Sequence, residues 1–570
     1  MSESSDPRQP NQRKIPLWAW GLVALISAGG YYAVRTFGGG GGDIVLPPGF
    51  TITTGEDSGG GSATEARTGG PGSLGDLIAA TVPGESDRFQ ASIAILPLEN
   101  RTGDTLFDTL GNGMTEQLIT RLSRIRGLKV ISPQSVRELE GLSLSVAQVA
   151  DTLDVDHLLQ GTAFLDQDVA RIEVRLLQVA GESELWRNDY SIDRTNQMRA
   201  VEEISDEVSQ ALLEQVPTLS LRGSSHSTVS PGYVSYLAGN RLLNTRTRDG
   251  LIRAIDAFRD AIGHDSTLAS AYAGLSSAYA LSITYRYDIG VDGYSAAGLA
   301  LSAAGEAVRL DPELAEAYAA RGYISSVAFA PAQTVLEDFT RALELQPNAP
   351  NVPAWYANLL VREGYYDQAL AEAQRAVALD PLSPARRTGL AYEALRARDY
   401  GLAIESARTA QAYGEEVILP RSIQALALLL SGRAEECLEV DLGPHAGIRA
   451  MCLHDLGRAD RAKAITDSLR ATVQAGAQAH PDFTNVIPAG DLAAYLAWTG
   501  SPDRALPWVH RAYSLSPSGI DPRVLESGVF EQLLANGQMR REVAEIRNRI
   551  WTRVLRELVE ADAELGRRNN

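Results

Sequence analysis

Three prolines recur at nearly even intervals in the C-terminal half of the chain, and this spacing limits the possible folds more than any other feature. Pro312, Pro347 and Pro381 lie 35 and 34 residues apart, and each ends a similar segment of sequence. The segments are Glu306–Pro312, Arg341–Pro347 and Arg375–Pro381. A self-similar unit of this length predicts paired helices that must stack on their neighbours, because one pair cannot bury its apolar face alone.

The unit resembles the tetratricopeptide repeat, in which small residues let two helices approach closely and a proline follows the second helix. Gly322 fits the small position of a first helix, and Ala369, Ala373 and Ala376 fit a second helix. The resemblance implies an all-α solenoid of about seven units over residues 228–530, several of them degenerate. Polar-faced helices over residues 531–570 are expected to cap it, and the repeat count stays open.

Stacked repeats of this kind curve, and the first helix of each pair lines a concave groove. By their position in the repeat, Tyr323, Asn358, Thr388 and Tyr392 are predicted to face this groove. Thr388 and Tyr392 are four residues apart and therefore share one face of a helix. We predict that protein partners bind there, and an ordinary solvated helix surface is the alternative for each of the four residues.

A different periodicity begins at Phe89 and predicts an α/β domain over residues 89–216. A short buried strand is expected from Ser92 to the break at Pro97. Further strands are predicted at Leu128–Ile131, His157–Leu165, Val169–Gln178 and Leu185–Ile192. Helices are predicted at Thr115–Arg126, from Ser132-Pro133 onward, at Val146–Leu153 and at Met198–Leu213. The order β-α-β-α-α-β-β-β-α indicates a mixed sheet covered by helices.

Four ordered blocks in this domain resemble the TolB N-terminal-like (FlgO-like) domain, which stands beside tetratricopeptide repeats in many bacterial proteins. The blocks are Ser92–Asn100, Gly113–Leu118, Leu158–Thr162 and Leu185–Tyr190. In that family the domain commonly follows a DNA-binding, adenylate-cyclase or protein-kinase module, and the sequence predicts none of these here. The resemblance implies no catalytic residue.

Residues Ile15–Val34 form an uncharged run of 20 residues, about the length that crosses a bilayer core. Arg13 and Lys14 precede the run, and this basic flank places the N-terminus in the cytoplasm. The sequence thus predicts a cytoplasmic tail over 1–14 and a transmembrane helix over 15–37, so that Ile15–Phe37 contacts the membrane. The expected location is the bacterial cytoplasmic (inner) membrane, single-pass, with the body extracytoplasmic. A cleaved signal peptide is the alternative.

Residues 38–88 are predicted to be a flexible linker rich in glycine. The segment begins with five consecutive glycines, Gly38–Gly42. A chain of this composition cannot bury enough apolar surface to offset the conformational entropy lost on ordering.

Two cysteines, Cys437 and Cys452, are present, and neither belongs to a CxxC pair. We expect two buried thiols that act as small apolar side chains. A disulfide between neighbouring helices is the alternative.

Known catalytic motifs are missing from the sequence, which contains no GxxxxGK[ST] loop, no kinase catalytic loop, no HExxH and no GxSxG. The seven histidines are dispersed, so no metal site, cofactor or catalytic residue is predicted. The net charge of −19 argues against a nucleic-acid surface, which needs clustered cations. The sequence therefore predicts a non-enzymatic, membrane-tethered protein-interaction scaffold. The alternative is a regulatory sensor whose α/β domain binds a ligand or envelope component and signals through a separate membrane partner.

Overall fold

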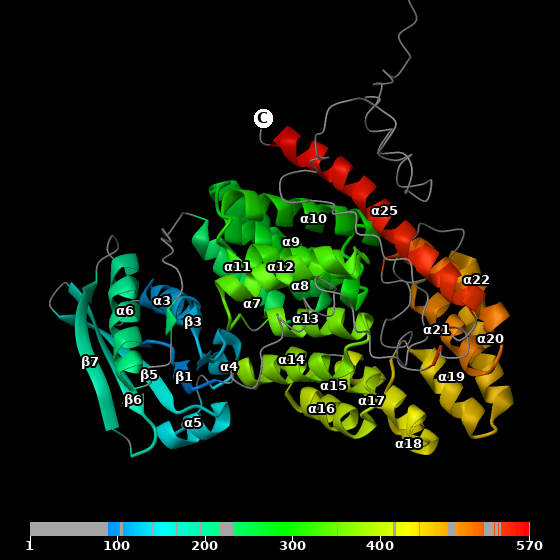
Figure 1. Cartoon of the computed structure of the whole chain (residues 1–570), viewed down its shortest axis with the longest axis horizontal. Coiled ribbons are helices and arrows are strands. Elements are labelled where there is room, and N and C mark those ends of the chain that lie inside the picture. The colour runs from blue at the N-terminus through cyan, green and yellow to red at the C-terminus, as the bar shows by residue number, and fades with distance from the viewer. Residues whose placement is uncertain are drawn as a thin grey trace, which may run out of the picture. The chain divides into compact units, whose positions relative to one another are not determined.

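A six-stranded mixed sheet forms the first part of the structure, a computed structural model (Figure 1). The model describes residues 89–568 apart from 103–105, 140–141, 143, 167–168, 182, 193–196, 216–219, 222–231, 350, 414–417, 444, 477–485, 518–528, 531–533 and 535–536. The strands are β1 (Ala91–Ile95), β2 (Glu99–Asn100), β4 (Leu128–Val130), β5 (His157–Asp166), β6 (Val169–Gln178) and β7 (Ser183–Ile192). Their order is β4-β1-β5-β6-β7, with β2 also paired to β5.

The pairing directions confirm the mixed sheet. Strand β1 runs parallel to both β4 and β5, whereas β5, β6 and β7 form an antiparallel meander. Successive side chains on a strand point to opposite faces. Ile93 and Ile95 therefore pack with helices α3 (Leu106–Leu122) and α6 (Gln197–Gln215), while Ala94 packs with α4 (Pro133–Arg137) and α5 (Val146–Leu153). A separate pair joins β3 (Ile125–Arg126) to β8 (Ser220–Leu221).

Helix α3 begins nine residues before the predicted start at Thr115 and ends at Leu122. Glycine disfavours a helix interior, and this stretch contains Gly111 and Gly113, which conceal the helix in the sequence. Packing does not require glycine at Gly111, because a Cβ there would lie 3.4 Å from the Cβ of Leu98, an ordinary van der Waals contact.

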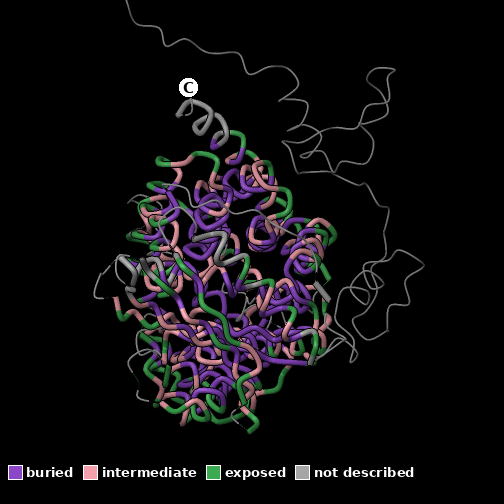
Figure 2. Tube along the Cα trace, turned by 90° about the vertical axis from the view of Figure 1, so that its left-hand side faces the viewer, coloured by how far each residue is buried: buried purple, intermediate pink, exposed green. Residues whose placement is uncertain are grey.

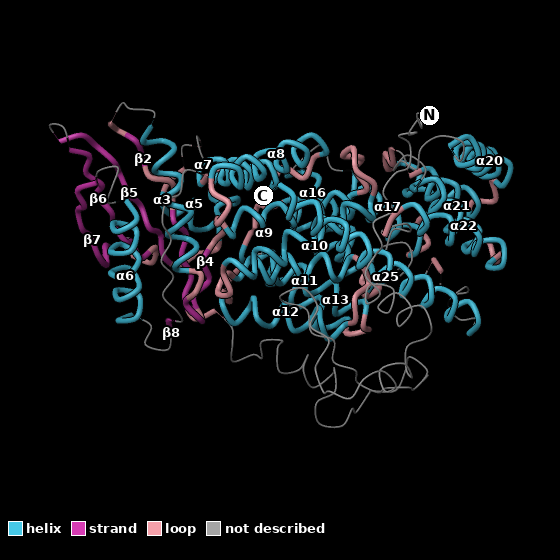
Figure 3. The backbone as a smooth tube through the Cα atoms, turned by 90° about the horizontal axis from the view of Figure 1, so that it is seen from above, coloured by secondary structure: helices cyan, strands magenta, loops and turns pink. Residues whose placement is uncertain are grey.

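The rest of the described chain is helical, and Figure 3 shows the strands gathered apart from it. Helices α7 to α22 follow one another as eight consecutive pairs among the described residues, where the sequence predicts about seven. They are α7 (Tyr233–Asn244), α8 (Arg248–His264), α9 (Ala269–Tyr285), α10 (Gly293–Leu310), α11 (Ala315–Val327), α12 (Ala332–Leu345), α13 (Asn351–Arg362), α14 (Tyr366–Leu379), α15 (Pro384–Arg396), α16 (Tyr400–Tyr413), α17 (Ile418–Leu430), α18 (Ala434–Glu439), α19 (Ala446–Asp455), α20 (Ala459–Gly476), α21 (Val486–Trp498) and α22 (Pro502–Leu515). Pro312, Pro347 and Pro381 each stand two residues after a second helix, as predicted.

Small residues let the helices interlock. Phe258 of α8 is fully buried, and its ring lies against Gly239 of α7 and Gly274 of α9. A Cβ on Gly274 would come within 2.4 Å of that ring, and one on Gly239 within 2.6 Å. Figure 2 shows buried residues gathered in the interior and exposed residues toward the outside.

A single long helix, α25 (Gly537–Arg568), occupies most of the segment in which capping helices are predicted. It packs along α10, far earlier in the sequence, and also contacts α22 (Figure 1). Its buried residues recur at helical spacing: Met539, Val543, Ile546, Ile550, Val554 and Leu558. Gly298 of α10 permits a close approach, since a Cβ there would lie 2.6 Å from the carbonyl carbon of Glu557.

Buried hydrogen bonds join the sheet domain to the helical array. The carboxamide of Asn348 donates to the carbonyls of Ser123, Ile125 and Leu128, at 3.2, 3.0 and 2.6 Å. The hydroxyls of Ser132 and Ser135 both donate to one carboxylate oxygen of Asp380, which lies just after α14. The hydroxyl of Ser135 also accepts from the amide of Leu382 at 3.0 Å.

The two cysteines form a disulfide, so the expectation of two separate thiols is wrong. Cys437 of α18 and Cys452 of α19 are both fully buried, and their Cα atoms lie 6.4 Å apart. Neighbouring units are stacked closely enough here to bring together side chains that stand 15 residues apart. The bond therefore links the second helix of one unit to the first helix of the next.

The predicted location in the bacterial inner membrane is corrected by the structure. Among the helices of the described residues, none is both long and apolar enough to cross a membrane. A crossing needs about 20 apolar residues. Helix α21 is strongly apolar but has 13 residues, and α25 has 32 but carries charges along its length. The predicted tail, transmembrane helix and linker, residues 1–88, lie outside the described residues.

Gly274→Ala is expected to destabilise the protein by about 1–3 kcal/mol, because the added methyl group overpacks against Phe258. Gly305→Ala is the matched control, since Gly305 lies within α10 and an added Cβ would meet no atom within 4 Å. That control should stabilise the protein by about 0.5–1 kcal/mol, because alanine is the better helix former. Urea unfolding followed by circular dichroism measures both, and a neutral Gly274→Ala would contradict the described packing.

The double change Cys437→Ser and Cys452→Ser is expected to lower the free energy of unfolding by about 3 kcal/mol, the estimate for opening a closed loop of this length. Urea unfolding of the oxidised protein and of the variant measures the difference. Intact mass should differ by two hydrogens before and after reduction. Two free thiols in the purified, unreduced chain would refute the disulfide.

Candidate functional site

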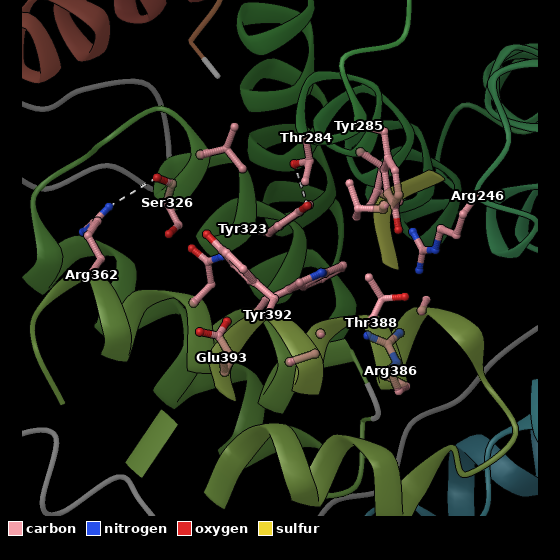
Figure 4. Close-up of a pocket in the computed structure, with 18 of the residues that line it drawn as sticks. Arg246, Thr284, Tyr285, Tyr323, Ser326, Arg362, Arg386, Thr388, Tyr392 and Glu393 are labelled. Atoms are coloured by element: carbon pink, nitrogen blue, oxygen red, sulfur yellow. Dashed lines mark hydrogen bonds between the residues drawn. The ribbon is translucent and has the colours of Figure 1, made fainter. Parts of the chain in front are cut away.

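A cavity of about 160 Å³ opens among the first helices of five consecutive pairs (Figure 4). Its walls come from α9, α11, α13, α15 and α17. Arg246, in the turn between α7 and α8, Phe329, in the turn between α11 and α12, and Pro517, after α22, complete the lining. The site thus combines residues that lie up to 271 positions apart (517 − 246).

All four residues that the sequence predicts in a groove line this one cavity. Tyr323 comes from α11, Asn358 from α13, and Thr388 and Tyr392 from α15. Tyr323 and Thr388 are buried, while Asn358 and Tyr392 are half-buried. The structure therefore brings the four together, and their role in binding stays a prediction.

An aromatic stack forms one wall. The rings of Tyr323 and Trp355 lie 4.4 Å apart between centroids and are inclined by only 9°. The hydroxyl of Tyr323 shares a hydrogen bond of 2.7 Å with that of Thr284 on α9. Burial raises the pKa of Tyr323 to about 12, so the phenol is neutral at physiological pH and can serve as a hydrogen-bonding group.

Helix α15 supplies a second wall with its own internal support. The hydroxyl of Thr388 donates to the carbonyl of Pro384 at 2.7 Å, one turn earlier. The guanidinium of Arg396 lies 4.7 Å from the ring centre of Tyr392 and donates to Glu393 at 3.3 Å. Because the Arg396–Glu393 pair is fully buried, it holds this face of the helix in one arrangement.

Three arginines line the cavity, and none of them is predicted from the sequence. Arg362 is held by the carbonyls of Ser326 and Ala330, at 3.2 and 3.3 Å, and pairs with Glu363. Arg386 donates to the side chain of Asn351. Burial lowers the pKa of Arg386 to about 10, which still leaves the group charged at neutral pH. Arg246 enters from the turn after α7.

Helix spacing could have identified two of the missed residues. Trp355 and Arg362 stand three before and four after Asn358, so they share its helix face. Arg246 carries no such signal. It occupies a turn with left-handed backbone (φ 54°), and only the folded array places that turn beside α15.

The lining suits binding better than bond-making chemistry. Its polar groups are guanidiniums, hydroxyls, one carboxamide, the indole N–H of Trp355 and one carboxylate, and that carboxylate already pairs with Arg396. No cluster of three or more His, Cys, Asp or Glu side chains that could hold a metal ion occurs in the described part of the chain. The cavity offers ring faces for apolar contact and fixed donors for anionic or carbonyl groups.

Comparison with known proteins relates the sheet domain to transcriptional regulators. The second domain of HilA/YgeH-like transcriptional regulators matches residues 89–210. A curated relative, a putative adenylate cyclase 3 of Rhizobium meliloti (strain 1021), is 28% identical over 158 residues. That match covers 27% of this chain, and the chain spans about a quarter (26%) of the relative's length. The finer resemblance to the TolB N-terminal-like domain stays a prediction.

Solved structures with tetratricopeptide repeats resemble the helical array only slightly. YrrB, described as a TPR protein with an unusual peptide-binding site, is 18% identical with a TM-score of 0.21, and the likeness covers 37% of this chain and 94% of YrrB. TTC0263 from Thermus thermophilus, a thermophilic TPR protein, is 18% identical with a TM-score of 0.28, covering 35% and 99%. Likenesses this slight carry no argument about function.

Asp380→Asn is expected to lower the free energy of unfolding by about 3–5 kcal/mol, because it removes the buried carboxylate that serves Ser132, Ser135 and Arg386. Asp256→Asn, exposed on α8, is the control and should change stability by at most about 0.5 kcal/mol. Urea unfolding measures both variants. If Asp380→Asn lowered the free energy of unfolding no more than Asp256→Asn does, Asp380 would not join the sheet domain to the helical array.

Proposed function

We propose that the chain is a non-enzymatic protein-interaction scaffold that binds an extended polypeptide segment along the first helices of its array. One observation carries the proposal most strongly. Residues predicted from their repeat positions to face a groove line a single cavity, together with the stacked rings of Tyr323 and Trp355. The membrane attachment expected from the sequence is not part of this proposal.

Physical arguments support polypeptide binding at this surface. Aromatic side chains bury a large area with few rotatable bonds, so they contribute much of the energy at protein interfaces. Here Tyr323 and Trp355 are held by stacking, and Arg362 and Arg386 by hydrogen bonds. A surface arranged before binding loses less side-chain entropy when the partner arrives. Asn358 can satisfy the backbone of an extended segment, because a carboxamide both donates and accepts.

The sheet domain enters the proposal as a TolB N-terminal-like module that is fixed to the array. The bonds from Asn348 and Asp380 support a rigid attachment. The likeness of residues 89–210 to a domain of transcriptional regulators supports a role in signalling. The sensor alternative is not favoured, because the cavity described above lies in the helical array.

Absence of catalysis is likewise proposed. The curated relative is a putative adenylate cyclase, but this chain spans only 26% of its length, so we do not extend that activity to this chain. The polar groups of the cavity do not include a histidine, cysteine or lysine among the described lining residues. The one acid of the described lining, Glu393, already pairs with Arg396, which supports this part of the proposal.

The double variant Thr388→Ala and Tyr392→Ala is expected to weaken partner binding by about tenfold or more, because it removes two contacts from one face of α15. The full chain, tagged and expressed in its own host, serves as bait in a pull-down with quantitative mass spectrometry. Affinity for the captured partner is then measured by titration.

A closely matched control exists in the same array. Thr409 and Tyr413 on α16 have the same residue types and the same spacing of four. The hydroxyl of Thr409 also donates to the carbonyl one turn earlier, at 3.0 Å, but neither residue lines the cavity. Thr409→Ala with Tyr413→Ala should retain the wild-type affinity. If both double variants bind the partner as the wild type does, the groove is not the binding surface.

A further inference from the structure

Two buried arginines converge at one end of the cavity. Arg246 is 5% exposed and Arg386 is 6% exposed. The Nη1 of Arg246 and the Nε of Arg386 are buried without a hydrogen-bond partner. Figure 4 shows both side chains on the side of Thr388, while Arg362 and Ser326 lie at the opposite end. A buried donor left without an acceptor costs free energy until something fills the site.

The charges of the protein do not balance at this end. Asp380 lies 3.7 Å from the Nε of Arg386, and its other carboxylate oxygen already accepts from Ser132 and Ser135. No carboxylate of the described residues lies within ion-pair distance of Arg246. Glu393, the one acid among the described lining residues, pairs with Arg396. One positive charge is therefore left uncompensated, although the whole chain carries −19.

The backbone holds Arg246 in place for this arrangement. The residue adopts φ 54°, a conformation that costs free energy for any residue with a Cβ. The hydroxyl of Tyr287 donates to its carbonyl at 3.1 Å and so fixes the turn. Repulsion between the two guanidiniums also contributes to the low pKa of Arg386, after the larger effect of burial.

We propose that the Arg246–Arg386 end of the cavity is a binding site for a small oxyanion, with a carboxylate group as its preferred ligand. A carboxylate carries the single negative charge that the site lacks. Guanidinium groups present planar forks of donors that match its two oxygens, and the hydroxyls of Tyr285 and Thr388 lie beside them. The volume of about 160 Å³ equals roughly five water molecules, so the ligand is a small acid or one acidic side chain.

This site goes beyond the proposed function, because a free anion requires no polypeptide. The same chemistry could also be presented by a glutamate of a bound segment. The experiment therefore uses the full chain with three probes at constant ionic strength: sodium succinate, inorganic phosphate, and the blocked peptide Ac-Ala-Glu-Ala-NH2. Sodium chloride and the peptide Ac-Ala-Gln-Ala-NH2 are the reference solutes. Thermal unfolding is followed at increasing concentrations of each.

The wild-type chain should show a saturable rise in Tm with succinate, with the glutamate peptide, or with both. Arg246→Gln should weaken binding, so that the half-saturating concentration rises by about tenfold to a hundredfold, the range expected for a lost charge-assisted hydrogen bond. In chloride alone the Tm of this variant should equal or exceed the wild-type value, because an uncompensated buried charge is gone. Arg309→Gln, at an exposed position paired with Glu306, is the matched control and should respond as the wild type does.

A response to succinate identifies a free acid as the ligand, and a response confined to the glutamate peptide identifies an acidic side chain. Both outcomes support the site. A response to phosphate alone would overturn the preference for carboxylate. The site itself is refuted if no probe shifts the wild-type Tm, or if Arg246→Gln responds like the wild type.

Arg386→Lys, which keeps the charge toward Asp380, gives a second measurement should Arg246→Gln fail to fold. Failure of the anion titration would leave the pull-down result of the proposed function intact, and the reverse also holds.

Discussion

The helical array depends on one constraint: each helix pair exposes an apolar face that only its neighbours can cover. Phe258 illustrates how closely the pairs must approach, since its ring lies between Gly239 and Gly274 on two other helices. The same requirement applies at the C-terminus. Helix α25 carries an apolar stripe from Met539 to Leu558, and it buries this stripe along α10 rather than at the last unit alone. Stability is therefore shared between neighbours and belongs to no single pair.

This stacking also creates the cavity. The first helices of five consecutive pairs, α9, α11, α13, α15 and α17, repeat the same orientation. Side chains at equivalent positions on them therefore converge on one space. Buried pairs such as Arg396–Glu393 and Arg321–Asp338 lock the helices that line it. Polar groups can then be held away from water and still face an occupant. The cavity is thus a consequence of the repeat, while its charge comes from residues that differ between repeats.

Much of the architecture could be predicted from the sequence, and the failures have physical causes. The repeat interval and helix spacing predicted that Tyr323, Asn358, Thr388 and Tyr392 share one surface, because both follow from local geometry. All four line the one cavity, and their role in binding stays a prediction. Arg246 could not be found in this way, since it reaches the cavity from a turn. Glycines concealed the start of α3, because glycine disfavours a helix interior. The disulfide depended on which units are adjacent in space, which the spacing of two cysteines does not reveal.

Asp380 has a consequence for how this chain could change by recombination. One oxygen of its carboxylate accepts from the first turn of α4 in the sheet domain, and the other faces Arg386 in the cavity. A hybrid that joined this array to another sheet domain would leave Asp380 without its serine donors. A hybrid that kept the sheet domain and replaced the array would strand Ser132 and Ser135. These contacts therefore favour exchange of the two parts as one piece, even though each has the outline of an independent module.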